Sequence, residues 1–281
     1  MLARLVETVK KVSILLPYYN RKKLLLNTLR SYEYFYADKS LEICIVDDGS
    51  AEDQRIDDVS KLYPTLDIKL YRVKVKNGIN PCVPYNIAAR ISTGDVLVLT
   101  SPETFHTADM YELSSNFSEV ENGKYLCFSV FCLTDQDIYK KIFSDKSFES
   151  SINIFNEEFR ALLFDDLGEE GRAGFSNRFG SWYLHSQYRP SSLNFFTALK
   201  RELYFGLSGF DESYRNGTGY DDNEFLDRLR DRVDDIVYID DACAIHVDHP
   251  PVYGKGSPIS NQAIYLSRRK YLKNDDWGKL V

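Results

Sequence analysis

Polar residues able to act as ligands or bases stand directly after several apolar segments of this chain. They form the stretches PYYN at 17–20, DDGS at 47–50, SPETFH at 101–106, YDDNE at 220–224 and HVDH at 246–249. Carboxylates and imidazoles in such places can bind a divalent cation or accept a proton. Each stretch alone is also typical of ordinary structure, because Asp and Asn favour turns and helix caps. Whether these residues are functional or only structural therefore depends on the strands and helices that carry them.

Strand and helix signals alternate over the first hundred residues. Apolar runs at 12–17, 41–48 and 95–100 and an alternating run at 67–74 predict strands, and the segments 21–35, 53–63 and 84–92 between them predict helices. Buried strands separated by helices indicate a doubly wound, parallel α/β sheet. Ligands bind such sheets beyond the carboxyl ends of the strands, which is where the polar stretches stand.

The pattern is looser from about residue 111 onward. It predicts a strand at 124–133, a partly charged helical segment at 148–166, a strand followed by a helix at 193–203, a helix starting within 219–231, and one or two strands at 235–249. No internal repeat, low-complexity segment or Gly/Ser linker divides the sequence. We therefore expect one domain with two halves.

Composition excludes several classes of protein. The net charge of −7 over 281 residues argues against general nucleic-acid binding. The five cysteines form no C-x-x-C pair, so a disulfide framework or zinc site is not expected, and a reducing, cytoplasmic compartment fits. No apolar run is long enough to span a membrane. The first eleven residues lack a signal-peptide core, although they could form an amphipathic helix and touch a membrane surface.

In their order along the chain, several segments resemble the family 2 glycosyltransferases of the GT-A fold. They are VSILLPYYN, LEICIVDDGS, NGINPCVPYNIAARISTGDVLVLTSPE, FFTALKRELYFGLSGFDESY and GYDDNEFLDRL, and they span roughly residues 12 to 250. The resemblance implies a Rossmann-like, mostly parallel open sheet flanked by helices. It also implies a single GT-A domain over 1–281, in which about 12–110 binds the nucleotide sugar and about 111–281 supplies the acceptor-binding and catalytic half.

The resemblance assigns the donor nucleotide to the first strand end and the DDGS loop. It implies that Pro17 and Tyr19 flank a uracil-like ring and that Asp48 accepts the imide N–H of that ring. An aromatic face for stacking and a carboxylate for a donor edge make physical sense in a base pocket. The donor-binding residues expected in this way are Pro17, Tyr19, Asn20, Asp48, Asn77 and Ser101.

The family's metal-binding Asp-x-Asp motif falls on Ser101 and Glu103, so the sequence departs from the pattern at both positions. Glu103 can still bind a hard cation through oxygen. His246 and His249 follow the last predicted strand, where related enzymes often place a histidine ligand, and His106 is a weaker candidate. For each histidine a structural role is the alternative. A mixed carboxylate–imidazole site suits Mn²⁺ better than Mg²⁺.

The segment GYDDNEF occupies the place of the family's catalytic carboxylates. The resemblance makes Asp222 the general base and Asp221 a ligand of acceptor hydroxyls. Trp182 and Tyr183 lie in an aromatic segment, 174–190, of the kind that stacks on sugar rings or fills a buried corner. Tyr85 stands where many relatives carry an arginine near the diphosphate, and Arg189 or another residue of that segment could replace the missing cation.

The sequence thus predicts an inverting, metal-dependent glycosyltransferase that moves a sugar from a nucleotide sugar, UDP-linked, to a glycan or glycoconjugate hydroxyl. Two alternatives remain open. One is a catalytically silent module that binds a nucleotide sugar or glycan, which the altered Asp-x-Asp motif keeps in view. The other is a sugar nucleotidyltransferase, which would need a Gly-rich phosphate loop where PYYNRKK stands.

Overall fold

The computed structural model describes residues 11–76, 78–116, 123–143, 148–154, 180–250, 260–267 and 276–279. The elements of the first half are β1 (Val12–Tyr18), α1 (Lys22–Tyr36), β2 (Leu41–Asp47), the 3₁₀ turn η1 (Glu52–Gln54), α2 (Val59–Leu62), β3 (Asp67–Arg72), α3 (Cys82–Ile91), β4 (Val96–Thr100), β5 (Thr104–His106) and α4 (Tyr111–Asn116). Those of the second half are β6 (Lys124–Leu133), α5 (Gln136–Ile142), α6 (Phe148–Ile154), β7 (Gly180–Leu184), β8 (Phe196–Lys200), α9 (Arg201–Gly206), the 3₁₀ turn η3 (Glu212–Asn216), α10 (Asp221–Arg230), β9 (Asp235–Val247) and α11 (Gln262–Leu266).

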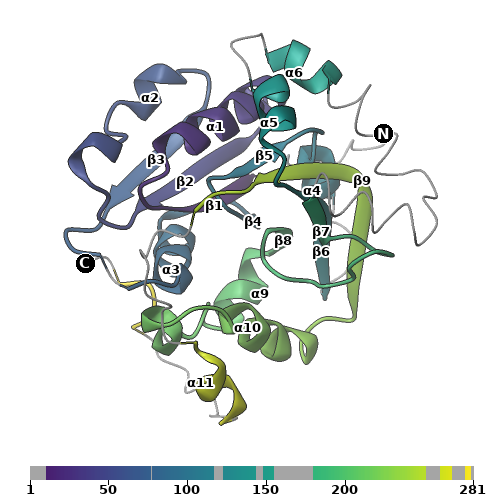
Figure 1. The fold of residues 1–281 in the computed structure, drawn as a ribbon. Helices are drawn as coiled ribbons and strands as arrows, with labels where there is room; N and C mark the ends of the chain where they lie inside the picture. Colours follow the sequence, from purple (N-terminus) through teal and green to yellow (C-terminus); the bar gives the residue numbers. More distant parts are fainter. Residues whose placement is uncertain are drawn as a thin grey trace, which may run out of the picture.

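The nine strands form one sheet in the order β3-β2-β1-β4-β8-β6-β9-β5, with β7 also paired to β6 (Figure 1). The first four strands of this order pair in parallel, as the alternation of strands and helices predicts. Successive strand residues face opposite sides of a sheet. On β1, Ile14 and Leu16 therefore pack in the core beneath α1, while Leu15 packs with Ile87 of α3 in the core on the other side.

The second half departs from a parallel sheet. β8 runs antiparallel to β4, and β6 is antiparallel to both β7 and β8 but parallel to β9. Only Ser101, Pro102 and Glu103 separate β4 from β5, so the chain turns sharply and β5 pairs antiparallel with β9. This pairing places Thr104 opposite His246 and so brings two predicted ligand stretches together.

Most predicted elements are confirmed. The strand expected at 124–133 is β6, and the segment 235–249 forms one long strand, β9, with an irregularity opposite Phe128 and Ser129. The helix predicted at 53–63 is wrong, because the chain there forms only η1 and the single turn α2. The leading segment 1–10 and residues 155–166 of the predicted charged helix lie outside the described residues.

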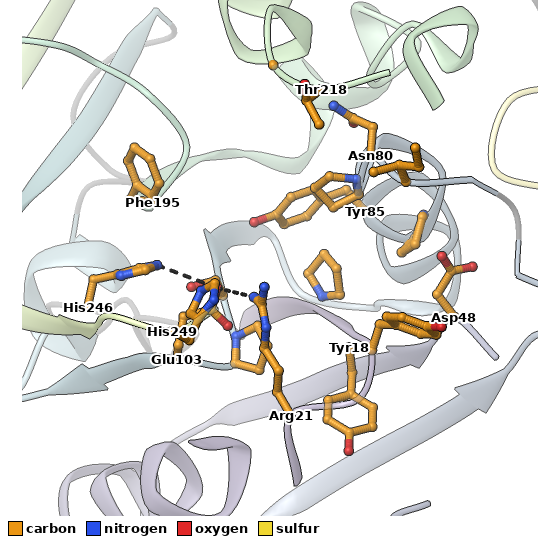
Figure 2. A pocket seen from close by; sticks show the side chains of 18 of the residues that line it. Tyr18, Arg21, Asp48, Asn80, Tyr85, Glu103, Phe195, Thr218, His246 and His249 are labelled. Atoms are coloured by element: carbon orange, nitrogen blue, oxygen red, sulfur yellow. Dashed lines mark hydrogen bonds and ion pairs between the residues drawn. The ribbon is translucent and has the colours of Figure 1, made fainter. Parts of the chain in front are cut away.

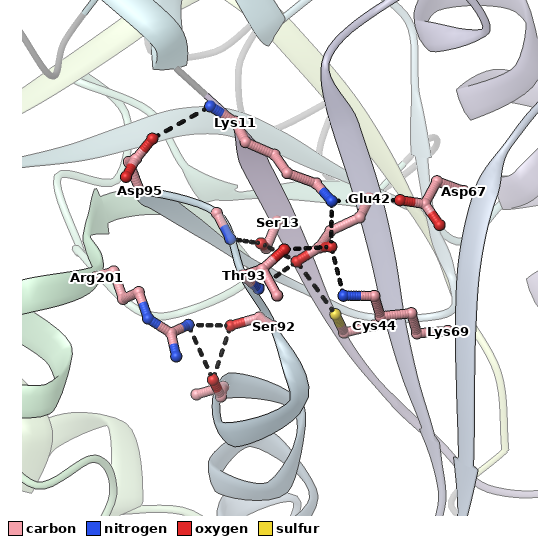
Figure 3. A network of polar contacts seen from close by, with 12 residues as sticks. Lys11, Ser13, Glu42, Cys44, Asp67, Lys69, Ser92, Thr93, Asp95 and Arg201 are labelled. Atoms are coloured by element: carbon pink, nitrogen blue, oxygen red, sulfur yellow. Dashed lines mark hydrogen bonds and ion pairs between the residues drawn. The ribbon is translucent and has the colours of Figure 1, made fainter.

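A buried carboxylate fastens the strands at the edge opposite their carboxyl ends (Figure 3). Glu42 of β2 is fully buried and pairs with Lys11 at 2.6 Å and Lys69 at 2.7 Å. It also accepts hydrogen bonds from Ser13 and Thr93. Burial alone would raise the pKa of Glu42, but these hydrogen bonds hold it well below its usual range. The network joins β1, β2, β3 and the turn before β4, and so stabilises the half of the sheet that carries the polar stretches.

Among the residues that the structure describes, no helix is both long and apolar enough to cross a membrane.

Candidate active site

A cleft of about 720 Å³ opens at the carboxyl ends of β1, β2 and β4 (Figure 2). One wall comes from the loops that follow these strands, and the opposite wall from β7, the start of β8 and the end of β9. The loop Gly217–Gly219, just before α10, completes the lining. The cleft thus stands at the edge of the sheet where the sequence predicts ligand binding.

One end of the cleft presents an aromatic ring, a carboxylate and an ammonium group. Pro17, Tyr19 and Asp48 line it as predicted. Lys76, which the sequence analysis missed, lies 3.7 Å from the centre of the Tyr19 ring and 3.1 Å from Asp48 Oδ2. The carboxylate of Asp48 is almost completely buried, so water competes little for a hydrogen bond between this group and a bound ligand.

The adjacent Asp47 has a different role from Asp48. It is fully buried, accepts a hydrogen bond from the backbone N–H of Ser50, and pairs with Arg72 at 2.9 Å. Strand alternation turns one of the two neighbouring carboxylates into the protein and leaves the other at the cleft. Asp47 therefore shapes the loop, and Asp48 is the carboxylate that lines the cleft.

Two other predicted donor residues are placed differently. Asn20 has a φ of 52° and its side-chain oxygen accepts the backbone N–H of Ala51. It ties the end of β1 to the loop after β2 and is not among the residues that line the cleft. Asn20 thus has a role in loop geometry, and its contact with the nucleotide stays a prediction. Asn77 lies outside the described residues.

The middle of the cleft holds the predicted metal ligands. Glu103 Oε1 lies 3.2 Å from His249 Nε2 and 3.5 Å from His246 Nε2. The turn between β4 and β5 brings Glu103 here, and its backbone oxygen accepts the N–H of Val247 at 3.0 Å. Ser101 also lines the cleft, where its hydroxyl bonds that of Thr104. The structure thus unites Glu103 with two histidines that come from the other half of the chain.

The residues present fit a divalent cation. One ligand atom from each of Glu103, His246 and His249 can be chosen so that all lie within 4.8 Å of one another. Glu103 Oε2 is buried and has no hydrogen-bond partner among the described residues, so it is an acceptor that still needs a donor or a cation. One carboxylate with two imidazoles is a donor set that can hold a divalent metal ion.

Arg21 is the second cationic side chain in the cleft that sequence reasoning missed. Its Nη1 lies 2.6 Å from Glu103 Oε1, and Figure 2 shows it reaching that carboxylate from the end of β1. Burial would raise the pKa of Glu103, but the hydrogen bonds from both histidines and the Arg21 charge hold it well below its usual range. The sequence signal was the position of Arg21 directly after PYYN, at a strand end.

Arg21 lines the cleft, whereas Arg189, the cation expected near the diphosphate, is placed elsewhere. The Arg189 guanidinium lies 5.5 Å from the Tyr183 ring and donates to the backbone oxygen of Trp182, and Arg189 is not among the cleft-lining residues. Tyr85, which stands at the family's arginine position, does line the cleft. Its hydroxyl donates to the backbone oxygen of Thr100, which fixes the ring.

His106 is a core residue and no metal ligand in this arrangement. Strand alternation turns it away from the cleft, where its ring stacks on Phe196 at 4.2 Å and bonds the Tyr36 hydroxyl at 2.8 Å. Complete burial lowers the pKa of His106 to about 3, so the ring stays neutral. His106 is therefore not grouped with Glu103 in the way expected, because its ring is packed in the core against Phe196 and Tyr36.

Two adjacent carboxylates begin α10 beside the cleft. Asp221 accepts a hydrogen bond of 2.6 Å from Asn80, a residue that lines the cleft. Asp222 accepts one of 2.8 Å from Asn194. Burial and the neighbouring Asp221 charge raise the pKa of Asp222 to about 8, and burial also raises the pKa of Asp221. A carboxylate with a pKa near neutrality is well matched to accept a proton.

The two predicted aromatic residues face opposite sides of β7. Tyr183 lines the cleft, stacks on Phe195 at 4.6 Å, and meets the His246 ring edge-on at 4.9 Å. Trp182 instead packs against Phe131 and His185 on the other face. Tyr183 therefore lines the cleft and Trp182 belongs to an aromatic cluster apart from it, and contact of either ring with the acceptor stays a prediction.

The sheet order, the cleft at its carboxyl edge and the return of β9 beside Glu103 define a GT-A fold, and solved structures agree. S. aureus TarS superposes with a TM-score of 0.58 at 15% identity, over 91% of this chain and 38% of TarS. The mannosyltransferase PcManGT from Pyrobaculum calidifontis, solved with GDP-Man and Mn²⁺, gives 0.53 at 18% identity, over 89% of this chain and 59% of its own. GalNAc-T7, solved with UDP, GalNAc and Mn²⁺, gives 0.56 at 13% identity, over 92% and 48%.

Residues 13–137 match the family model described as glycosyl transferase family 2. The chain thus carries the sequence signature of that family over this segment, and the resemblance noted in the sequence is confirmed. At these identities the solved structures support the fold alone, and the chain spans less than two thirds of the length of each protein cited. Comparison with curated proteins gave no match.

Proposed function

We propose that the protein is a glycosyltransferase that moves a sugar from a UDP-linked donor to a hydroxyl group of a glycan or glycoconjugate, with inversion at the anomeric carbon. The observation that carries this proposal is the cleft itself, which unites Asp48, Glu103 and His246 at the carboxyl edge of a family 2 sheet. Asp221 and Asp222 adjoin it through Asn80. About 12–110 would bind the donor and about 111–281 the acceptor.

The donor end of the cleft supports a uracil-like base. Tyr19 offers a ring for stacking, Asp48 an acceptor for the imide N–H, and Lys76 a donor for a neighbouring carbonyl. Pro17 and Ser101 complete the wall from the base toward the diphosphate. The relatives named above were solved with uridine or guanosine nucleotides, so a nucleotide sugar is the class of ligand that the fold favours.

Glu103, His246 and His249 would hold a divalent cation, Mn²⁺ in preference to Mg²⁺. When bound, such an ion neutralises the negative charge of a nucleoside diphosphate leaving group. Arg21, already in contact with Glu103, adds a permanent positive charge at the same place. The chain's own residues therefore provide a carboxylate to hold the cation and a cationic side chain to offset the charge of the leaving diphosphate.

Asp222 would act as the general base. It takes the proton from the acceptor hydroxyl as the oxygen forms its bond to the anomeric carbon, and the bond from that carbon to the diphosphate oxygen breaks. A single displacement of this kind inverts the configuration. Asp221 and Tyr183 would hold the acceptor, one by hydrogen bonding and the other by stacking on the sugar face. We assign the reaction to the cytoplasm, because the five cysteines are buried and form no C-x-x-C pair, a usage that fits a reducing compartment.

One alternative function has an observation in its favour. Arg21 already neutralises Glu103, and Ser101 lacks the charge of the family's first Asp. Both features would suit a module that binds a nucleotide sugar without metal and without turnover.

A screen of nucleotide sugars separates the two functions. Donor hydrolysis, which needs no acceptor, would be followed for UDP- and GDP-linked sugars with Mn²⁺, with Mg²⁺ and with chelator. We expect metal-dependent hydrolysis with at least one UDP sugar. Tight binding of a nucleotide sugar with no hydrolysis under any condition favours the silent module, and the absence of both binding and hydrolysis contradicts the proposal.

A further inference from the structure

Each of the paired carboxylates at the start of α10 is held by its own asparagine. Asn80, from the loop before α3, donates to Asp221 Oδ1, and Asn194, from the segment before β8, donates to Asp222 Oδ1. Both asparagines are buried. A carboxylate offers about four lone-pair sites, so these contacts fix the orientation of each group and leave further sites for a ligand.

The amide of Asn194 is itself oriented from behind. The hydroxyl of Tyr125, a fully buried residue of β6, donates a short hydrogen bond to Asn194 Oδ1. With its oxygen engaged by a donor, the amide must present its Nδ2 hydrogens to Asp222. Turning the amide over would lose both hydrogen bonds at once inside the core, where unpaired polar groups are costly.

We propose that Asn194, oriented by Tyr125, is a positioning residue that favours the ionised form of the Asp222 carboxylate and aims it for proton transfer. This inference rests on the proposed function, because it assigns a role toward the base of that reaction. Asn194 does not contact the reacting atoms. It acts through Asp222 alone, to which its amide donates at 2.8 Å.

The surroundings of Asp222 show why a neutral donor matters here. The titratable groups that interact with it are Asp221 on the same helix, the Tyr85 hydroxyl from α3 and the Tyr125 hydroxyl from β6, with the Cys82 thiol beside Asp221. None of these four is a cation, and Asp221 repels a second negative charge. Burial and Asp221 raise the pKa of Asp222 to about 8, while the Asn194 hydrogen bond lowers it. Asn194 thus offsets part of the cost of ionising the base.

The test is the pH dependence of kcat/KM for sugar transfer by wild type, Asn194→Ala and Tyr125→Phe. A hydrogen bond to a charged group is strong enough to move a pKa by about one to two pH units. We expect Asn194→Ala to raise the midpoint of the acid limb by that amount and to lower kcat/KM at pH 7 by about 10-fold or more. Its activity should recover substantially at high pH. Tyr125→Phe keeps the ring and should shift the midpoint in the same direction by less.

Ser192→Ala is the matched control. Ser192 is a buried hydroxyl two residues from Asn194, but its contact is with the Tyr238 hydroxyl. We expect an unchanged midpoint in this variant. A uniform loss of rate at every pH in Asn194→Ala, with the midpoint unmoved, would mean that Asn194 is merely structural and would overturn the inference. If Asn194→Ala does not fold, an unmoved midpoint in Tyr125→Phe overturns it instead. Failure of wild type to transfer or hydrolyse any nucleotide sugar would refute the proposed function, a different outcome from an unmoved midpoint.

Discussion

Replacing Asp222 by Asn should make the protein more stable at alkaline pH while removing its activity. The pKa of this carboxyl is about 8 in the folded protein against 3.8 for an ordinary Asp. Between these two values the folded state keeps a proton that the unfolded state has lost. Folding stability therefore falls as pH rises from about 4 to 8, and stays lowered above pH 8. Asn cannot ionise, so the variant escapes this loss.

The size of the effect follows from the same two pKa values. Each pH unit between 3.8 and about 8 corresponds to about 1.4 kcal/mol, which sets a ceiling of about 6 kcal/mol. Asp222 keeps part of its surface exposed to water, which screens its charge. We therefore expect a gain in the free energy of unfolding of about 2–3 kcal/mol instead. For a chain of this length that is a rise in Tm of roughly 4–6 °C. Asn keeps the size of Asp and can still accept the hydrogen bond from Asn194.

The assay is thermal and urea unfolding of wild type and Asp222→Asn at pH 5 and pH 8.5. We expect a small difference at pH 5 and a clear gain for the variant at pH 8.5. Sugar transfer should fall by on the order of 10² or more, with unchanged UDP affinity. Two results would contradict this pKa for Asp222. One is a variant that is no more stable than wild type at pH 8.5. The other is a wild type whose stability rises with pH in step with that of the variant. Unchanged transfer would remove Asp222 from the role of base.

Four further substitutions probe the cleft and the strand beside it. Asp48→Ala should weaken UDP binding roughly 10- to 100-fold even in chelator, because its expected contact is to the base; normal binding with a lower Tm would mean that Asp48 only shapes the loop. His246→Ala should reduce the enhancement of UDP binding by Mn²⁺, measured by calorimetry, by about 10-fold, and an undiminished enhancement would make His246 structural. Tyr183→Ala should raise the KM for the acceptor. Trp182→Ala should leave that KM unchanged and lower the free energy of unfolding by about 2–3 kcal/mol. The reverse pattern would contradict the placement of these two rings on opposite faces of β7.

The first half of the fold was predictable because its strands are buried on both faces and read as continuous apolar runs. β1, β2 and β4 lie within a few residues of their predicted bounds. The helix predicted at 53–63 failed because helical spacing alone does not make a helix without enough apolar surface to bury, and most of residues 51–62 are exposed. The antiparallel pairings of β5 through β9 depend on tertiary contacts that no local pattern encodes.

The candidate site was predictable where a residue type follows a strand, and less so where geometry chooses between neighbours. Glu103, His246 and His249 were expected together and lie together. The sequence could not show that Arg21 reaches Glu103, because lysines and arginines after a strand end are usually solvated. Nor could it show that Asn80 and Asn194 hold the paired carboxylates, since an isolated asparagine carries no pattern. Separating Trp182 from Tyr183 required knowing that both lie on a strand.

The proposed function depends on Glu103 as the carboxylate through which a divalent cation supports nucleotide binding. Calorimetric titration of UDP into wild type and Glu103→Gln, each with Mn²⁺ and with chelator, tests it most directly. Gln keeps the size of Glu but removes the charge, and Glu112→Gln is the matched control because Glu112 is an exposed acid on α4. We predict that UDP affinity of Glu103→Gln in Mn²⁺ falls to its value in chelator, while Glu112→Gln keeps the full Mn²⁺ enhancement. Equal Mn²⁺ enhancement in wild type and Glu103→Gln would contradict the account.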